Sequence, residues 1–173
     1  MQSIETFRTE RLIAARLREE DFGELVRMHR DLRVMATLGG LRSENETQQF
    51  LCKNLDHWSR HGYGLWVFRD QADGRFVSRG GLRNVYVGGN DEVELAYALR
   101  AEYWGKGLAT EMAKAILQVG FQQLGMTNVV CFTLTTNSAS QRVMEKVGFK
   151  YQQDLVHADL PHMLYRITAF TKK

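Results

Sequence analysis

Proline and cysteine are scarce in this chain. Pro161 is the single proline among 173 residues, and no proline-rich linker, low-complexity tract or internal repeat divides the sequence. Cys52 and Cys131 are too few for a disulfide framework or a zinc knuckle, and we expect both to be buried, inert thiols. A single domain over residues 1–173 is therefore the simplest organisation.

Long apolar runs and a strong net charge are also missing. No segment is apolar over the length needed to cross a bilayer, and residues 1–5 do not begin a secretory signal. We therefore expect a cytoplasmic protein with no membrane partner. The formal net charge of +3 is too small to indicate nucleic acid as a direct partner, although it mildly favours an anionic cofactor.

A metal site has little support in the sequence. His57 and His61 lie four residues apart in a predicted helix and could face one ion. No glutamate of a metalloprotease pattern surrounds them, so we expect no metal.

Hydrophobic periodicity predicts a mixed α/β order of elements. The predicted elements are a strand at 12–17, helices at 21–31 and 44–60, strands at 64–68, 76–87 and 93–99, a helix at 107–124, a strand at 129–134, a helix at 138–147, and strands at 149–155 and 163–170. Strand 93–99, helix 107–124 and strand 129–134 form a βαβ unit, so the two strands should be parallel. Ligands of parallel sheets bind at the carboxyl ends of such strands.

The segment 104–110 lies at one of these carboxyl ends and reads Trp-Gly-Lys-Gly-Leu-Ala-Thr. The first turn of the helix that follows has N–H groups without intrahelical partners and a partial positive charge, so its backbone could hold a pyrophosphate. Gly105 and Gly107 would let the ligand approach closely, or they merely shape a tight turn. Neither nucleotide motif fits, because Gly107 follows Lys106 and Thr110 stands where a dinucleotide fingerprint needs glycine or alanine.

A second polar segment, 136–140, follows the predicted strand 129–134 and should open on the same crevice. It contains Asn137, Ser138 and Ser140. Ser138 with Gln141 also has the spacing of a capping box, so the cluster could simply begin the predicted helix 138–147.

Taken together, these segments resemble the GNAT superfamily of N-acetyltransferases, and within it the branch of ribosomal-protein N-terminal acetyltransferases, the RimJ/RimL-like branch. The resemblance covers nearly the whole chain, through the segments 8–12, 61–66, 94–97, 104–110, 137–140 and 145–149. It implies a mixed central sheet with a parallel, splayed strand pair at an acyl-CoA site, flanked by about four helices.

The resemblance also implies acetyl-CoA as cosubstrate. The superfamily's acyl-CoA loop reads Gln or Arg, two residues, Gly, one residue, then Gly or Ala; here Gly107 and Ala109 match, and Trp104 replaces the Gln or Arg. By resemblance the backbone of 97–99 pairs with the pantetheine arm. The expected cofactor-binding residues are Tyr97, Ala98, Leu99, Trp104, Gly105, Lys106, Gly107, Leu108, Ala109, Thr110, Asn137, Ser140 and Arg142.

Acetyl transfer to an amine needs a neutral nucleophile, an oxyanion stabiliser and a proton for the departing thiolate. By resemblance, Ser140 is the first catalytic candidate, placed to donate to the thiolate. Glu94 is the best-placed carboxylate for a general base, acting directly or through water, although an exposed strand glutamate without a chemical role is the alternative. Tyr97 and His162 are weaker acid–base candidates.

The resulting hypothesis is an acetyl-CoA-dependent N-acetyltransferase that acts on a primary amine, either a protein N-terminus such as that of a ribosomal protein or a small molecule. The alternatives are a noncatalytic acyl-CoA-binding or regulatory module and, more remotely, a phosphate-binding protein of another fold. We expect loops 32–43, 87–91 and 157–162 to select the acceptor. A cationic acceptor would suit an acidic mouth, but the sequence does not place the carboxylates that could form it, Glu44, Glu46, Asp91, Glu92 and Asp159. It also leaves the oligomeric state open, a homodimer included.

Overall fold

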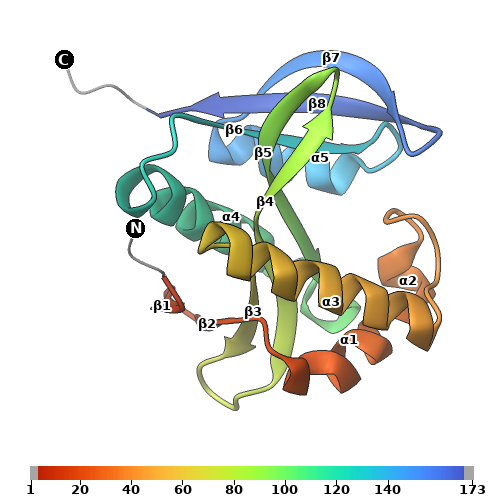
Figure 1. Ribbon diagram of the computed structural model, residues 1–173, viewed down its shortest axis with the longest axis vertical. Helices are drawn as coiled ribbons and strands as arrows, with labels where there is room; N and C mark the ends of the chain where they lie inside the picture. The colour runs from red at the N-terminus through yellow and green to blue at the C-terminus, as the bar shows by residue number, and fades with distance from the viewer. Residues whose placement is uncertain (1–3, 170–173) are drawn as a thin grey trace.

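A computed structural model describes residues 4–169 and contains an eight-stranded sheet with helices on both faces (Figure 1). The strand order is β1-β2-β3-β4-β5-β6-β8-β7. In chain order the strands are β1 (Thr6–Arg8), β2 (Leu12–Arg16), β3 (Leu65–Asp70), β4 (Phe76–Val87), β5 (Asn90–Leu99), β6 (Asn128–Leu134), β7 (Lys150–His157) and β8 (Leu160–Thr168). The helices are α1 (Phe22–His29), α2 (Leu32–Met35), α3 (Glu44–His61), α4 (Leu108–Gln118) and α5 (Ser138–Val147).

The parallel pair β5–β6 is the point where the sheet opens. The other neighbouring strands are antiparallel, whereas β5 and β6 run parallel and their register joins Glu94 to Val130 alone within residues 4–169. In Figure 1, β6, β8 and β7 run roughly horizontally, whereas β4 and β5 run roughly vertically. The carboxyl ends of β5 and β6 therefore diverge.

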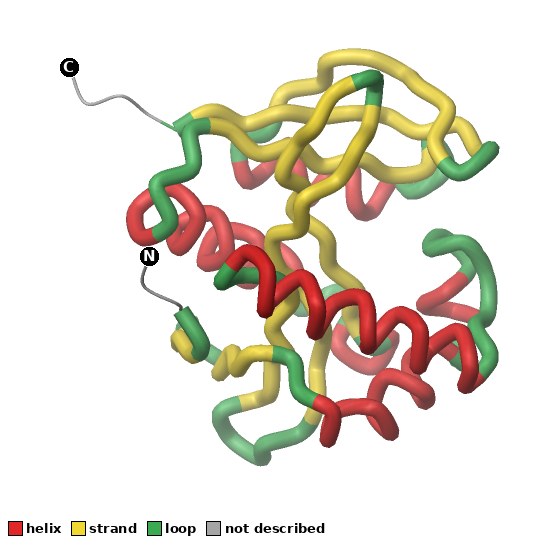
Figure 2. The backbone as a smooth tube through the Cα atoms, in the orientation of Figure 1, coloured by secondary structure: helices red, strands yellow, loops and turns green. Residues whose placement is uncertain are grey.

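Apolar side chains pack on both faces of the sheet. Helices α1, α2 and α3 cover one face, where Leu25, Met35 and Leu51 pack with Leu65 and Phe76. Helix α4 covers the other face with its own buried stripe, and Figure 2 shows α3 in front of the strands and α4 behind them. Burial of each large apolar side chain contributes about 1.5–3 kcal/mol to the stability of the fold. The helices packed on the two faces therefore hold β5 and β6 in their diverging positions.

The predicted mixed α/β class and the parallel strand pair are confirmed. About four helices are predicted, and the additional helix in the structure is α2, which the sequence pattern does not indicate. This helix spans four residues, and the Asp31 side chain caps it by accepting from the N–H of Arg33. So short a helix has no repeating apolar stripe, and β1, with three residues, is equally short for a strand pattern.

Several boundaries differ from the predicted ones. The predicted helix 107–124 is α4 followed by a π-helical turn, Val119–Gln123, which the apolar spacing does not distinguish from α-helix. Strand β8 begins at Leu160, three residues before the predicted strand 163–170, whose last residue lies outside the described residues. Residues 1–3 of the N-terminal segment lie outside them as well.

The prediction of two buried thiols is wrong for one cysteine. Cys131 on β6 is buried, and burial raises the pKa of its thiol, so this thiol stays protonated. Cys52 is exposed. Helix α3 turns Leu51, Asn54 and Trp58 inward, and the helical period leaves Cys52 on the solvent side.

No helix within residues 4–169 is long and apolar enough to span a bilayer. The cytoplasmic location stays a prediction.

Candidate active site

A cleft of about 1150 Å³ lies where β5 and β6 diverge. The predicted catalytic residues Glu94 and Ser140 both line it. So do the predicted cofactor-binding residues with one exception, namely Tyr97, Ala98, Leu99, Trp104, Gly105, Gly107, Leu108, Ala109, Thr110, Asn137 and Arg142. Lys106 is the exception; its ammonium group lies 5.5 Å from the ring centroid of Tyr103. The two separate sequence signals therefore meet in one place.

The glycine turn 104–107 presents an uncapped helix N-terminus to this cleft. Gly105 and Gly107 have φ angles of +73° and +76°, in the left-handed region that glycine adopts without strain. Gly107 is the N-cap of α4, and no side chain caps the helix there. A Cβ atom at Gly105 would meet nothing within 4 Å, so the approach to these amides is open. The geometry fits a bound pyrophosphate held by backbone N–H groups.

Two side chains hold this turn in place. The indole N–H of Trp104 donates to the carbonyl of Leu99 at 3.1 Å, which ties the turn to the end of β5 although the side chain is half exposed. Nη1 of Arg11 donates to the carbonyl of Lys106 at 2.9 Å. Trp104, where the superfamily pattern has Gln or Arg, therefore has a structural contact of its own.

Arg11 is itself held by Glu111 in the first turn of α4. Its Nε lies 2.8 Å from Oε1 of Glu111, and the Thr9 hydroxyl donates to Oε2 at 2.6 Å. Burial acts to raise the pKa of Glu111, but the hydrogen bonds from Thr9 and Arg11 outweigh it and lower the pKa. The segment 8–12 carried the resemblance, yet its contact with α4 about 100 residues away had no signal in the sequence.

At the other edge of the cleft, α5 has the predicted bounds, 138–147, but a different N-cap from the one that the capping pattern indicated. The N-cap is Asn137, whose side-chain oxygen accepts from the N–H of Ser140 at 3.2 Å. The interpretation of Ser138 as the cap is therefore wrong. Asn137 and Ser138 have the same capping chemistry, and the sequence pattern alone does not choose between adjacent caps.

Ser140 meets a tyrosine from the opposite strand. The phenol oxygen of Tyr97 lies 3.0 Å from the Ser140 hydroxyl oxygen, and either can donate. Burial raises the pKa of Tyr97, so the phenol stays protonated in the neutral pH range. The pair therefore places two hydroxyl groups, each a possible proton donor, where β5 and β6 separate.

Glu94 is a buried lining residue of the cleft. It is 6% exposed, so its interpretation as an exposed strand glutamate is wrong. Arg83, directly opposite on β4, donates to Oε1 of Glu94 through Nε at 3.1 Å and Nη2 at 2.8 Å. This ion pair fixes the carboxylate at the position where β5 pairs with β6.

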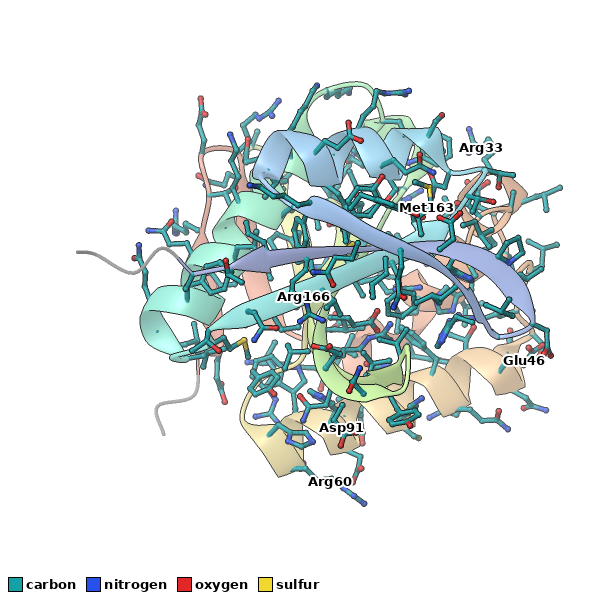
Figure 3. All side chains as sticks on the ribbon, turned by 90° about the horizontal axis from the view of Figure 1, so that it is seen from above. Arg33, Glu46, Arg60, Asp91, Met163 and Arg166 are labelled. Carbon is teal, nitrogen blue, oxygen red and sulfur yellow. The ribbon has the colours of Figure 1, made fainter. Side chains whose placement is uncertain are left out.

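Two of the three expected acceptor loops border the cleft. Loop 32–43 contributes Arg33 and Arg42 among others, and loop 157–162 contributes His157 and His162. Loop 87–91 forms the β4–β5 turn and, in the described part of the chain, adds no lining residue. Figure 3 shows the labelled Arg33 and Glu46, both lining residues, toward the same side of the molecule.

Sequence reasoning missed the basic residues that β4 directs into the cleft. Arg79 and Arg83 alternate with Gly81 on one face of the strand, and both arginines are lining residues. That alternation was the available signal, since period two puts all three on one face.

The ring nitrogens of His57 already have hydrogen-bond partners, and the expectation that His57 and His61 bind no metal stays a prediction. Because the backbone N–H of Asn84 donates to Nε2 of His57, the proton is on Nδ1, which donates to the carbonyl of Tyr63 at 2.8 Å. Both ring nitrogens of His57 are thus used. In the described residues, no group of three or more His, Cys, Asp or Glu side chains could hold a metal ion.

The comparisons with known proteins agree with this fold. A family model described as an acetyltransferase (GNAT) domain matches residues 11–150, so the chain belongs to the GNAT acetyltransferase family. The chain is 27% identical over 132 residues to a Bacillus subtilis (strain 168) protein named Uncharacterized protein YkkB, covering 76% of this chain and 77% of that protein. It is 32% identical over 96 residues to the FsC-acetyl coenzyme A-N(2)-transacetylase of Aspergillus fumigatus, covering 52% of this chain and 40% of that protein.

Solved structures show the same fold. An acetyltransferase from Agrobacterium tumefaciens (strain C58) superimposes with a TM-score of 0.85 at 25% identity, covering 98% of this chain and 97% of that one. A spermidine N-acetyltransferase from Vibrio cholerae, solved with CoA and spermine, superimposes with a TM-score of 0.74 at 17% identity, covering 91% and 95%.

Proposed function

We propose that this protein is an acetyl-CoA-dependent N-acetyltransferase that transfers the acetyl group directly to a primary amine. The observation that carries the proposal is the convergence of the uncapped turn 104–107 and the Tyr97–Ser140 pair on one cleft in a chain of the GNAT family. The similar FsC-acetyl coenzyme A-N(2)-transacetylase and the spermidine N-acetyltransferase solved with CoA support the same cosubstrate.

The binding roles follow from position in the cleft. Backbone N–H groups of 105–110 would hold the pyrophosphate, and Arg142 on α5 adds a cation at the same opening. Beyond Glu94 the edge of β5 that faces β6 is without a paired strand within the described residues, so the backbone of 97–99 is available to the pantetheine arm. Asn137 would contribute its amide N–H₂, because its oxygen already caps α5.

Acetyl-CoA supplies a thioester, which is already activated toward amines. In this proposal Ser140 donates a proton to the leaving thiolate, and the protonated phenol of Tyr97 supports that hydroxyl. Glu94 takes the proton of the amine, directly or through water. An α-amine with a pKa of about 8 needs little help near neutral pH, whereas a lysine side chain near 10.4 needs more.

The acceptor is either a protein N-terminus or a small-molecule amine, and the branch of ribosomal-protein N-terminal acetyltransferases stays a prediction. Homodimerisation also stays a prediction.

The test of the proposed function is acetyl-CoA-dependent release of free thiol across a panel of N-terminal peptides, amino acids and polyamines. We expect selective release for one acceptor class. Tight acetyl-CoA binding with slow thioester cleavage that no amine accelerates would instead favour the noncatalytic acyl-CoA-binding module.

A further inference from the structure

Four arginines line the half of the cleft that α3 and loop 32–43 border, and one of them, Arg33, forms salt bridges with Asp31 and Glu102. The other three are Arg42, Arg79 and Arg83. Arg79 and Arg83 come from β4, and Arg42 lies just before α3; we refer to the three as the arginine cluster. Glu94 neutralises Arg83. No carboxylate forms a salt bridge with Arg42 or Arg79 in the described part of the chain, although the charge of Glu46 acts on Arg42 and that of Glu94 acts on Arg79. Two of the three guanidinium groups therefore have no directly paired carboxylate.

Arg79 is held by neutral groups. It is 4% exposed, its Nε–H donates to Nε2 of His29 at 3.2 Å, and its guanidinium carbon lies 4.4 Å from the ring centroid of Phe50. Because Nε2 of His29 accepts, the proton is on Nδ1, which donates to the Thr47 hydroxyl at 3.0 Å. Burial, followed by the charges of Arg79 and Arg42, lowers the pKa of His29 to about 3. His29 is therefore neutral at physiological pH and provides Arg79 with no negative charge.

Arg42 is the second arginine of the cluster without a salt bridge. Its guanidinium carbon lies 5.0 Å from the ring centroid of Phe50. Its Nη1 is the one buried side-chain nitrogen or oxygen within residues 4–169 that has no hydrogen-bond partner. Leaving a buried donor unsatisfied costs about 1–3 kcal/mol, and more for a charged group. An anion bound at this place would offset that cost.

Space for such an anion is present beside the arginines. Arg79, Gly81 and Arg83 share one face of β4, and their partners on β5 are Ala98, Ala96 and Glu94. Ala96 and Ala98 are small and line the cleft, which leaves space beside them. The backbone of Gly64 fills the space beside Gly81, where a Cβ would lie 2.0 Å from the Gly64 carbonyl oxygen. The neighbouring residue Ser78 points to the other face of β4, where it meets Met112 of α4.

The position of the arginine cluster separates it from the site proposed for the CoA pyrophosphate. That site is the turn before α4, and α4 packs on the opposite face of the sheet. The arginine cluster faces α1 and α3 instead, through His29 and Phe50. It therefore faces the acceptor rather than the pyrophosphate. Of the five carboxylates that could have formed an acidic mouth, Glu46 alone is a lining residue within the described part of the chain.

We propose that the acceptor amine carries an oxyanion, a carboxylate or a phosphate, which binds Arg79 and Arg42. This inference rests on the proposed N-acetyltransferase function and names its class of acceptor. A guanidinium binds either oxyanion through parallel, charge-assisted hydrogen bonds, which are stronger than hydrogen bonds between neutral groups. A polyamine would meet two guanidinium groups that no carboxylate pairs with directly, so this part of the cleft disfavours it.

Binding of matched probes in the presence of CoA tests the inference without turnover. The first pair is N-acetylglycine and N-acetylglycinamide, and the second is phosphoethanolamine and ethanolamine. By isothermal calorimetry at constant ionic strength, we expect the anionic member of at least one pair to bind about 10- to 100-fold more tightly. The pair that shows the preference identifies the oxyanion as carboxylate or phosphate.

Three variants test which residues cause the tighter binding of the anionic probes. Arg79→Met keeps much of the side-chain volume and should abolish the preference, and Arg42→Gln should reduce it. Lys53→Gln is the matched control, because Lys53 is exposed on α3 and lines the same cleft, so its loss lowers the overall charge by the same amount. If Arg79→Met does not fold, Arg42→Gln decides. Equal binding of the neutral and anionic probes, or a preference that Lys53→Gln lowers as much as Arg42→Gln, overturns the inference.

Acetyl-CoA binding and thiol release on the same preparations separate the two proposals. Acetyl transfer to neutral or polycationic amines without any preference for anions would overturn the inference and leave the N-acetyltransferase function intact. A preference for anionic probes that depends on Arg79, with no acetyl transfer to any amine, would count against the enzymatic function and leave the oxyanion site in place.

Discussion

The hydroxyl of Ser140 at the start of α5 lies 3.0 Å from the phenol oxygen of Tyr97 on β5. This contact joins the two sides of the cleft at the place where the parallel strands separate. Because burial raises the pKa of Tyr97, its phenol remains a proton donor throughout the neutral range. When Tyr97 donates to Ser140, the serine proton is free to point into the cleft.

We expect Ser140→Ala to lower kcat by about 100-fold, since a positioned general acid contributes roughly 10²–10⁴-fold. Tyr97→Phe keeps the ring and removes the donor, so its loss should be smaller. Steady-state thiol release is the measurement, and Ser59→Ala, an exposed hydroxyl on α3, is the control. An unchanged kcat in Ser140→Ala would remove the acid assignment.

The ion pair between Glu94 and Arg83 makes Glu94→Gln informative for the proposed base. We expect the variant to lose the acidic limb of the pH–rate profile, most clearly with an acceptor of high pKa. Glu92→Gln is the matched control, because Glu92 lies two residues earlier on β5 and pairs with Arg166 at 2.6 Å. It loses an ion pair of the same kind but does not line the cleft.

Loss of the pair will also affect stability, since the Glu94→Gln substitution would leave Arg83 without its carboxylate. Urea unfolding of both variants measures this effect separately, and we expect each to lose about 1–3 kcal/mol. A Glu94→Gln enzyme whose pH–rate profile matches that of Glu92→Gln would exclude Glu94 as the base.

The local features of the cleft could be predicted, and the contacts between distant segments could not. The turn 104–107 could be located because a strand pattern, two glycines and a helix pattern follow one another directly. Residues of β5 alternate between large and small, and this local pattern predicted that Ala96 and Ala98 lie on one face of the strand. Such signals depend on periods of 2 and 3.6 residues within a short window.

The residues that surround Arg79 show what such windows miss. His29 and Phe50 come from different helices, and neither lies near β4 in the sequence. A buried arginine is also contrary to the usual preference of that residue for the surface. Only the packing of α1 and α3 on the sheet reveals that the charge of Arg79 is inside.

The contact of Arg11 with the carbonyl of Lys106 predicts an effect on cofactor binding. Arg11→Gln removes that bond and the ion pair with Glu111, so the turn before α4 should become less fixed. We expect the KM for acetyl-CoA to rise about five- to tenfold while kcat changes little, in line with a loss of about 1 kcal/mol. Arg8→Gln, at an exposed position on β1, is the control. Equal KM values in the two variants would contradict a supporting role for Arg11.

His29 makes folding stability depend on pH. Its side chain is fully buried, and burial, with the charges of Arg79 and Arg42, lowers its pKa from 6.5 to about 3. The unfolded chain therefore binds a proton between these pH values that the folded chain does not bind. The contribution of neutral His29 to the free energy of unfolding should be at its full value above pH 6.5 and should decrease as the pH falls toward 3.

Urea unfolding at about pH 7 and about pH 4.5 measures this dependence. One proton taken up over this range corresponds to about 2–3 kcal/mol, so the wild type should lose roughly that amount more than His29→Gln. His61→Gln, at the end of α3, should keep the dependence of the wild type. The His29→Gln variant will be less stable at neutral pH, because it loses the hydrogen bonds of the imidazole to Arg79 and Thr47. Its free energy of unfolding should nevertheless vary less with pH. An equal change in the wild type and His29→Gln would show that His29 is not the group that takes up the proton.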